Sequence, residues 1–137
     1  MHLGRDDGEV REARLLMPDG LLGVSCYDEI ERAAEAVADG ADAIAFGSMF
    51  PSSTKPNAVR APLELLKTAR NRWPTRRIIA IGGIDNGNIH EVAEAGAHAA
   101  ALITAVFDAS DPRRAAADLL HRFNEGRERH ESQRAAV

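Results

Sequence analysis

The sequence predicts an α/β fold built on a parallel sheet, and three observations support this. Short apolar runs alternate with amphipathic segments five times along the chain, which is typical of parallel βαβ units. The runs are almost continuously apolar, as expected for strands covered on both faces. The chain has 137 residues, 45% of them hydrophobic, and few aromatics. This composition suits one globular domain with an aliphatic core.

The five expected strands are "MHL", "LLGVS", "AIAFG", "RIIAIGG" and "AAALIT". A helix is expected after each, over 9–17, 28–39, 63–73, 89–95 and 111–123. In the second helix, apolar residues recur at helical spacing, and Gly40 is a natural residue to follow its end. Asp111 and Pro112 are a good N-cap and first residue for the last helix.

The predicted domain covers residues 1–124. Beyond it, "EGRERHESQRAAV" from Glu125 is charged and has no apolar face. Such a segment buries too little apolar surface to order itself. We therefore expect residues 125–137 to be a frayed or disordered tail.

Two arrangements fit alternating strands and helices: a doubly wound sheet and a (β/α)₈ barrel. Five units are too few for a complete barrel, which takes eight strands and typically ~250 residues. A dinucleotide-binding sheet would carry G-x-G-x-x-G after its first strand, and this sequence has no such spacing. The glycines of "IGGIDNGN" form a different loop.

Composition also excludes several functions. The formal net charge of −4 is spread along the chain, which argues against a nucleic-acid surface. No apolar run approaches the ~20 residues of a membrane span, and the first residues lack the apolar core of a signal peptide. Cys26 is the only cysteine, so no intrachain disulfide is possible, and we expect a reducing, cytoplasmic setting.

Polar residues gather where the proposed strands end. They are Asp6 and Asp7, Ser25, Ser52 to Lys55, Gly82 and Gly83, and Thr104. Parallel barrels carry their active sites on the rim formed by the carboxyl ends of the strands. These five loops are therefore expected to converge on one face.

Each of these residues also has an ordinary structural interpretation. Asp7 could bind Mg²⁺ or be an acidic residue in the first turn of a helix. Ser25 could donate to a phosphate or cap the next helix. Lys55 could clamp a phosphate or be a solvated loop lysine, and Gly83 could let backbone N–H groups approach an anion or form a tight turn. Cys26 is more simply a small buried residue than a nucleophile.

The five histidines have no metal-ligand spacing, and we assign them no chemistry.

The motifs "HLGRDD", "LLGVSCYD", "ADAIAFGSMFPSSTKPNA", "IIAIGGI" and "LITAVFDASDP", in that order, resemble the second half of the thiamine-phosphate synthase family. The resemblance covers about residues 1–123. It implies a partial TIM (β/α)₈ barrel that contains strands 4–8. The family joins a hydroxymethylpyrimidine diphosphate to a hydroxyethylthiazole phosphate, with Mg²⁺ as cofactor, and releases diphosphate and thiamine monophosphate. The resemblance therefore implies a transferase of thiamine biosynthesis that acts on small phosphorylated substrates.

The resemblance also implies roles for individual residues. Asp7 would bind Mg²⁺, Ser25 would contact the pyrimidine diphosphate, and Lys55 would contact its diphosphate. Ser25 and Lys55 are the implied catalytic residues. The thiazole phosphate would be held by Ser52, Ser53, Thr54, Gly83, Ile103 and Thr104.

The sequence departs from the family pattern in two ways. Arg5 and Asp6 stand where the family has Gln and Glu. The family's first three strands, with a second Mg²⁺ carboxylate, have no counterpart here. We therefore expect a truncated chain that is weakly active or inactive alone and that associates through open sheet edges. Two alternatives are a thiazole tautomerase-like relative and a non-catalytic half-barrel that binds thiazole phosphate.

Overall fold

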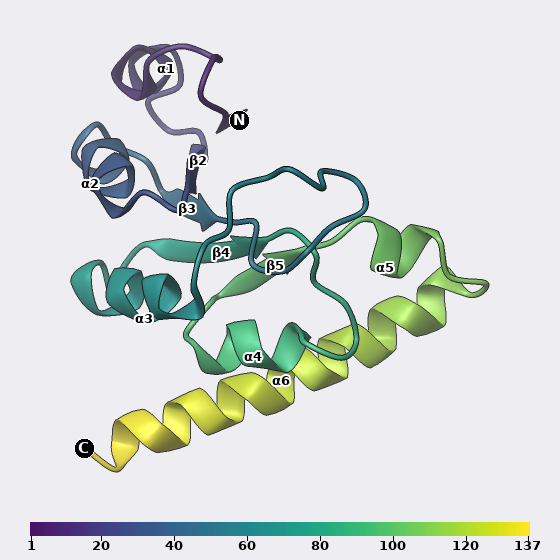
Figure 1. The fold of residues 1–137 in the computed structure, drawn as a ribbon. Coiled ribbons are helices and arrows are strands. Elements are labelled where there is room, and N and C mark those ends of the chain that lie inside the picture. The colour runs from purple at the N-terminus through teal and green to yellow at the C-terminus, as the bar shows by residue number, and fades with distance from the viewer.

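The computed structural model describes residues 1–137 and contains one five-stranded parallel sheet (Figure 1). Its strands pair in chain order, β1-β2-β3-β4-β5. The bounds are His2–Leu3 for β1, Gly23–Tyr27 for β2, Ala43–Phe46 for β3, Arg77–Ile81 for β4 and Ala99–Ala101 for β5. Every neighbouring pair is parallel. The predicted succession of five βα units is confirmed.

Helices α1 to α4 line the outer side of the curved sheet, and α5 lies beyond the carboxyl end of β5 (Figure 1). Their bounds are Val10–Leu16 for α1, Ile30–Ala38 for α2, Leu63–Arg72 for α3, Ile89–Glu94 for α4, Thr104–Phe107 for α5 and Pro112–Ala135 for α6. The long helix α6 packs along α4. None of these helices combines the length and the hydropathy of a membrane-spanning segment.

The core lies between the sheet and these helices. Alternate strand residues, among them Val24, Ile44 and Ile78, are fully buried there. On the other face Ser25, Ile79 and Ile81 stay half-buried. Ala45, which pairs with Ser25 and Ile79 on this face, is only 2% exposed. The expectation that both faces are covered therefore holds only in part, because the helices cover the outer face alone. A curved parallel sheet with helices outside and an open inner face is part of a β/α-barrel wall.

The last strand is shorter than predicted. β5 ends at Ala101, so Ile103 and Thr104 lie beyond it. Thr104 begins the short helix α5, where the sequence predicted a loop. Asp111 caps α6 as predicted, since its side chain accepts a hydrogen bond from the Arg114 N–H at 3.0 Å.

The prediction of a disordered tail from Glu125 is wrong, because α6 continues to Ala135. Gly126 is buried where α6 crosses α4, and a Cβ there would overlap the His90 carbonyl oxygen. Farther along, His130 Nδ1 lies 3.0 Å from the Glu94 carbonyl oxygen, and Gln133 donates to the Glu94 carboxylate at 2.9 Å. A close backbone approach and polar contacts order this segment, so it needs no apolar stripe.

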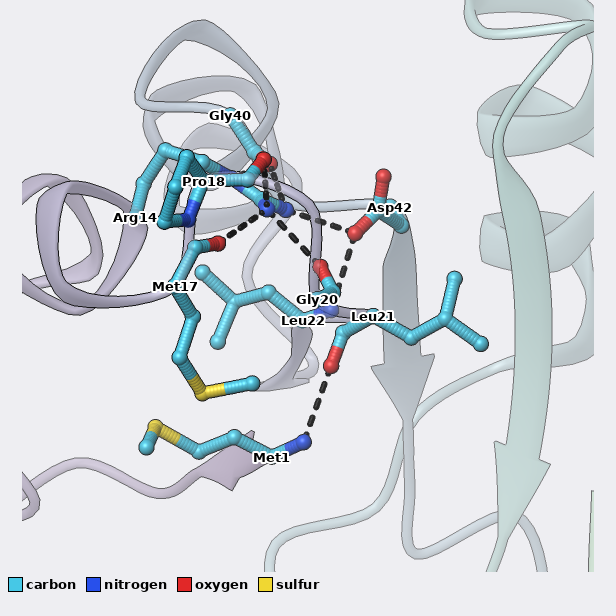
Figure 2. A network of polar contacts seen from close by, with 9 residues as sticks. All are labelled: Met1, Arg14, Met17, Pro18, Gly20, Leu21, Leu22, Gly40 and Asp42. Atoms are coloured by element: carbon cyan, nitrogen blue, oxygen red, sulfur yellow. Dashed lines mark hydrogen bonds and ion pairs between the residues drawn. The ribbon is translucent and has the colours of Figure 1, made fainter.

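At the amino ends of β2 and β3, one guanidinium holds two turns together. Figure 2 shows Arg14, which reaches from α1 into the turns before both strands. It donates to the carbonyl oxygens of Met17, Pro18, Gly20 and Gly40 at 2.8 to 3.1 Å. It also pairs with Asp42 at 2.6 Å.

Asp42 connects this network to the sheet. Its carboxylate accepts a hydrogen bond from the Leu22 N–H at 2.8 Å (Figure 2). That N–H, followed by the Arg14 guanidinium, holds the pKa of Asp42 below its ordinary value. The Arg14 side chain is only 22% exposed, so its charge and its acceptors are partly desolvated together.

We expect Arg14→Met to lower the free energy of unfolding by about 2–4 kcal/mol, since it leaves Asp42 and the turn carbonyls without their donor. Arg11→Met is the matched control on the same helix. Arg11 is 80% exposed and lies 3.5 Å from Asp39, and such surface pairs contribute about 0–1 kcal/mol. Urea unfolding of the two variants measures the difference, and equal losses would contradict the role given to Arg14.

A second polar contact closes the amino end of β4. His98 Nδ1 accepts hydrogen bonds from the Ile78 N–H at 3.0 Å and from Arg70 Nη1 at 3.2 Å. Partial burial, followed by the positive charges of Arg70 and Arg127, lowers the pKa of His98 from 6.5 to about 4. The neutral ring is therefore the form that fits this position.

This pKa shift predicts a loss of stability in mild acid. As the pH falls below about 6.5, the unfolded chain protonates at His98 before the folded chain does. The contribution of His98 is thus complete above pH 6.5 and is lost as the pH approaches 4. In His98→Asn the amide oxygen still accepts from Ile78 without titrating, so urea midpoints between these pH values should fall less steeply. His121→Asn, on the exposed side of α6, should keep the wild-type slope.

Candidate functional site

The predicted site residues all lie toward the carboxyl ends of the strands. Asp7 follows β1, the segment from Ser52 to Lys55 follows β3, and Gly83 follows β4. Ser25 lies within β2, and Ile103 and Thr104 start α5 after β5. Because the strands are parallel, these positions share one end of the sheet. The predicted convergence on one face therefore agrees with the fold.

The loop after β3 is closed at its base. The Ser48 N–H donates to the Val59 carbonyl at 2.8 Å, and the Ala61 N–H donates to the Ser48 carbonyl at 3.0 Å. The Arg60 guanidinium donates to the Met49 carbonyl at 2.9 Å. The intervening residues therefore leave and return at the same place.

The same loop is tied to the end of β4. The Met49 N–H donates to the Ile81 carbonyl at 2.9 Å, and the Phe50 N–H donates to the Gly82 carbonyl at 3.1 Å. Gly83 has a φ of +64°, and a Cβ there would overlap the carbonyl oxygens of Phe50 and Pro51. Glycine is required for this approach, which brings the start of the Ser52–Lys55 segment beside Gly83.

The hydroxyl and lysine side chains of this segment point into open surroundings. Ser52 is half-buried, and its Oγ lies 3.3 Å from the Thr54 N–H. Ser53, Thr54 and Lys55 are exposed. Lys55 makes no ion pair within the chain. A hydroxyl-rich turn with an ammonium group and a glycine at its foot can surround the oxygens of a phosphate.

Asp7 lies in the turn between β1 and α1. Its Oδ2 accepts a hydrogen bond from the Gly4 N–H at 2.6 Å, which orients the carboxylate. The N-cap of α1 is Glu9, so Asp7 precedes the helix and is not an acidic residue of its first turn. No three His, Cys, Asp or Glu side chains of the chain are grouped closely enough to hold a metal ion.

Ser25 does not cap α2, whose N-cap is Glu29. Its Oγ lies 2.8 Å from His2 Nε2, a contact that the sequence analysis missed. His2 pairs in register with Gly23, where an added Cβ would lie 2.6 Å from the ring. Because Gly23 has no side chain, the His2 imidazole can lie across β2 and contact Ser25. Only the register of the two strands could have revealed this pair.

A second missed cluster surrounds Tyr27. The Arg5 guanidinium lies 4.7 Å from the centre of the Tyr27 ring and is paired with Glu29. The Tyr27 hydroxyl accepts from the Arg5 N–H at 3.2 Å, and Arg32 lies 5.9 Å from the ring centre. Arg5 stands where the family has Gln. Its side chain packs on the Tyr27 ring of β2, next to the turn that carries Asp7.

Cys26 belongs to the core. Its side chain is fully buried, and burial raises the pKa of its thiol to about 11. A thiol in this state is a poor nucleophile at neutral pH. The interpretation of Cys26 as a small buried residue agrees with its surroundings.

The fold and the rim define a β/α-barrel protein whose candidate site is built from the loops at the carboxyl ends of its strands. The family model described as thiamine monophosphate synthase matches residues 1–106. The chain belongs to this family.

Several known proteins are similar to the chain. Thiamine-phosphate synthase of Halorhodospira halophila is 54% identical over 130 residues, covering 93% of this chain and 61% of that protein. Thiamine-phosphate synthase of an Azoarcus species is 56% identical over 113 residues, covering 82% and 54%. The solved thiamine phosphate pyrophosphorylase from Pyrococcus furiosus is 34% identical with a TM-score of 0.81, covering 91% and 59%. The chain thus spans about three fifths of the length of these relatives.

Gly83→Ala should disturb the site through both its φ and the overlap with Phe50 and Pro51. We expect a loss of about 3 kcal/mol in the free energy of unfolding and faster proteolysis between Pro51 and Pro56. Gly8→Ala is the control, since Gly8 has a φ of +99° but no atom within 4 Å of an added Cβ. Its loss should be about 1 kcal/mol. Equal losses in urea unfolding would mean that the close approach at Gly83 is unimportant.

Proposed function

We propose that this chain carries the thiazole-phosphate side of a thiamine-phosphate synthase site. The reaction is the condensation of hydroxymethylpyrimidine diphosphate with hydroxyethylthiazole phosphate to give thiamine monophosphate and diphosphate. One observation carries the proposal: in a chain of this family, Met49 and Phe50, just ahead of the Ser52–Lys55 segment, are tied by backbone hydrogen bonds to the β4 end, and Gly83 packs against the Phe50 and Pro51 carbonyls. The similarity to proteins named thiamine-phosphate synthase favours this activity over a tautomerase-like one.

The thiazole phosphate binds between the loops that follow β3, β4 and β5. Ser52, Ser53 and Thr54 donate hydroxyl groups from one side. Gly83 lets backbone approach the phosphate from another side, and Ile103 and Thr104 close the third. Several neutral donors around one phosphate fix its position without requiring a positive charge at each contact.

The pyrimidine diphosphate binds at the β1 and β2 side of the same rim. Ser25 contacts it, and Lys55 places a positive charge next to the departing diphosphate. His2 holds the Ser25 hydroxyl from the neighbouring strand. In a site closed to water, the ammonium group stabilises the negative charge that develops on the leaving group.

Asp7 is the carboxylate that this chain offers to Mg²⁺. A single exposed carboxylate suits this ion, which usually keeps several waters and takes its other oxygens from substrate phosphates. When bound, Mg²⁺ neutralises charge on the diphosphate. The Gly4 N–H keeps one oxygen of Asp7 in place.

In the proposed reaction the bond between the pyrimidine methylene carbon and the diphosphate oxygen breaks, and the electron pair leaves with diphosphate. The aminopyrimidine stabilises the resulting cation. The thiazole nitrogen then donates its lone pair to the methylene carbon and forms the new carbon–nitrogen bond. No nucleophilic side chain is needed, which agrees with the buried state of Cys26.

We also propose that the active form associates through its sheet edges. β1 and β5 each have only one neighbour in the sheet. Large apolar side chains are exposed near both edges, among them Leu15 and Leu16 on α1 and Phe107 on α5.

The single buried cysteine suits a reducing compartment such as the cytoplasm.

The function is tested by calorimetry of the full chain with each substrate separately, in the presence of Mg²⁺. Lys55→Met should weaken binding of the pyrimidine diphosphate at least about tenfold, the effect of losing roughly 1.4 kcal/mol. Binding of the thiazole phosphate should change less than about twofold. Lys67→Met removes the same charge from α3, where Lys67 pairs with Glu64 at 2.7 Å, and should change neither affinity.

Two results would contradict the proposal. One is that neither substrate binds to the chain. The other is that Lys55→Met and Lys67→Met behave alike. Product formation by the isolated chain should stay well below ~1 s⁻¹, the lower end of usual enzyme turnover.

A further inference from the structure

A small cavity lies at the end of the sheet opposite the candidate site. It lies between α3, the turn from α4 to β5, and α6, and its volume is about 190 Å³. The residues that line it are Arg70, Ala93, Gly96, Ala97, His98, Arg127, His130 and Glu131. His98 directly precedes β5, so the cavity is at the amino ends of the strands, away from Gly83 and Lys55.

The polar lining of this cavity carries two arginine charges and one carboxylate, beside two imidazole rings. Arg70 comes from α3, His98 from the turn, and Arg127 and His130 from α6, whereas Glu131 is the only acid. Burial, followed by the charge of Arg134, lowers the pKa of Arg70. Arg127 Nη2 lies 3.6 Å from the Glu131 carboxylate, whereas Arg70 has no ion-pair partner, and this remaining positive charge favours an anionic ligand.

Nitrogen atoms in this cluster lack partners. Arg70 Nε and His130 Nε2 are both buried, and neither has a hydrogen-bond partner. Of the two, Arg70 Nε is a donor that lacks an acceptor, whereas His130 already donates from Nδ1 to the Glu94 carbonyl oxygen. Buried donors and acceptors are nearly always paired, so unpaired ones point to a missing partner. His98 Nδ1 already accepts two hydrogen bonds, which leaves its proton on Nε2, where it can be donated.

The backbone leaves room for these groups to approach one another. Gly96 has a φ of +103°, and a Cβ there would lie 3.1 Å from both Arg70 Cγ and His130 Cε1. A larger residue would force the Arg70 and His130 side chains to shift by a few tenths of an ångström. His98 and Arg127 are exposed, so the cavity can be reached from solvent.

We propose that this cavity is a binding site for a small oxyanion of the phosphate class, separate from the candidate substrate site. The volume of the cavity suits a small ion. It exceeds the ~30 Å³ share of one water and is below the ~300 Å³ at which pockets for organic ligands usually begin. Arg70 and Arg127 offer planar guanidinium donors, which suit tetrahedral oxyanions. The bound anion joins α3, the α4–β5 turn and α6.

The test is titration of the full chain with inorganic phosphate, followed by the NMR resonances of the His98 and His130 rings. These resonances report this cavity even where phosphate also binds near Gly83. We expect saturable shifts that sodium chloride at equal ionic strength does not produce. Arg127→Gln should weaken binding at least about tenfold, and Glu131→Gln should strengthen it.

Arg122→Gln is the matched control, because Arg122 is also exposed on α6 but does not line the cavity. Its affinity for phosphate should stay within about twofold of the wild type. Circular dichroism checks that every variant is folded. The proposal is overturned if phosphate shifts the His98 and His130 ring resonances no more than chloride does. It is also overturned if the Arg127→Gln and Arg122→Gln variants bind phosphate equally well.

Discussion

The structure depends on one constraint: each strand pairs in parallel with the next strand in the chain. Every βα unit must therefore return to the same end of the sheet before the next strand begins. This separates two sets of loops. Those that leave the carboxyl ends contain Asp7, the Ser52–Lys55 segment and Gly83. Those that enter the amino ends contain Gly40, Asp42 and His98.

The two ends are stabilised by different interactions. At the amino ends, side-chain cations hold the turns: Arg14 binds four carbonyl oxygens and Asp42, and Arg70 shares His98 with the Ile78 N–H. At the carboxyl ends, backbone hydrogen bonds hold the β3 loop against β4. Of the polar side chains there, Asp7, Ser25 and Ser52 each make one short contact within the chain, and Lys55 makes no ion pair.

Local sequence patterns predicted much of the fold. The strands follow from apolar runs, the Asp111 cap from capping chemistry, and the tight turn at Gly83 from a pair of glycines. Contacts that depend on register or on distant segments were not predictable. His2 reaches Ser25 only because it pairs with Gly23, and Arg14 binds Gly40, which lies 26 residues farther along the chain. The tail was misjudged because α6 packs through Gly126 and polar contacts, which hydrophobic periodicity does not detect.

The inner face of the sheet connects the fold to the proposed chemistry. Ser25, Ile79 and Ile81 on this face are half-buried, and the neighbouring Ala99 and Ala101 are exposed. In complete barrels this face is filled by packed side chains, and separation of charge from diphosphate is favoured where water is excluded. A phosphate can be bound by loops at an open rim, but the departure of diphosphate needs a covered interior. Binding and turnover should therefore separate in this chain, and association through β1 or β5 should affect turnover first.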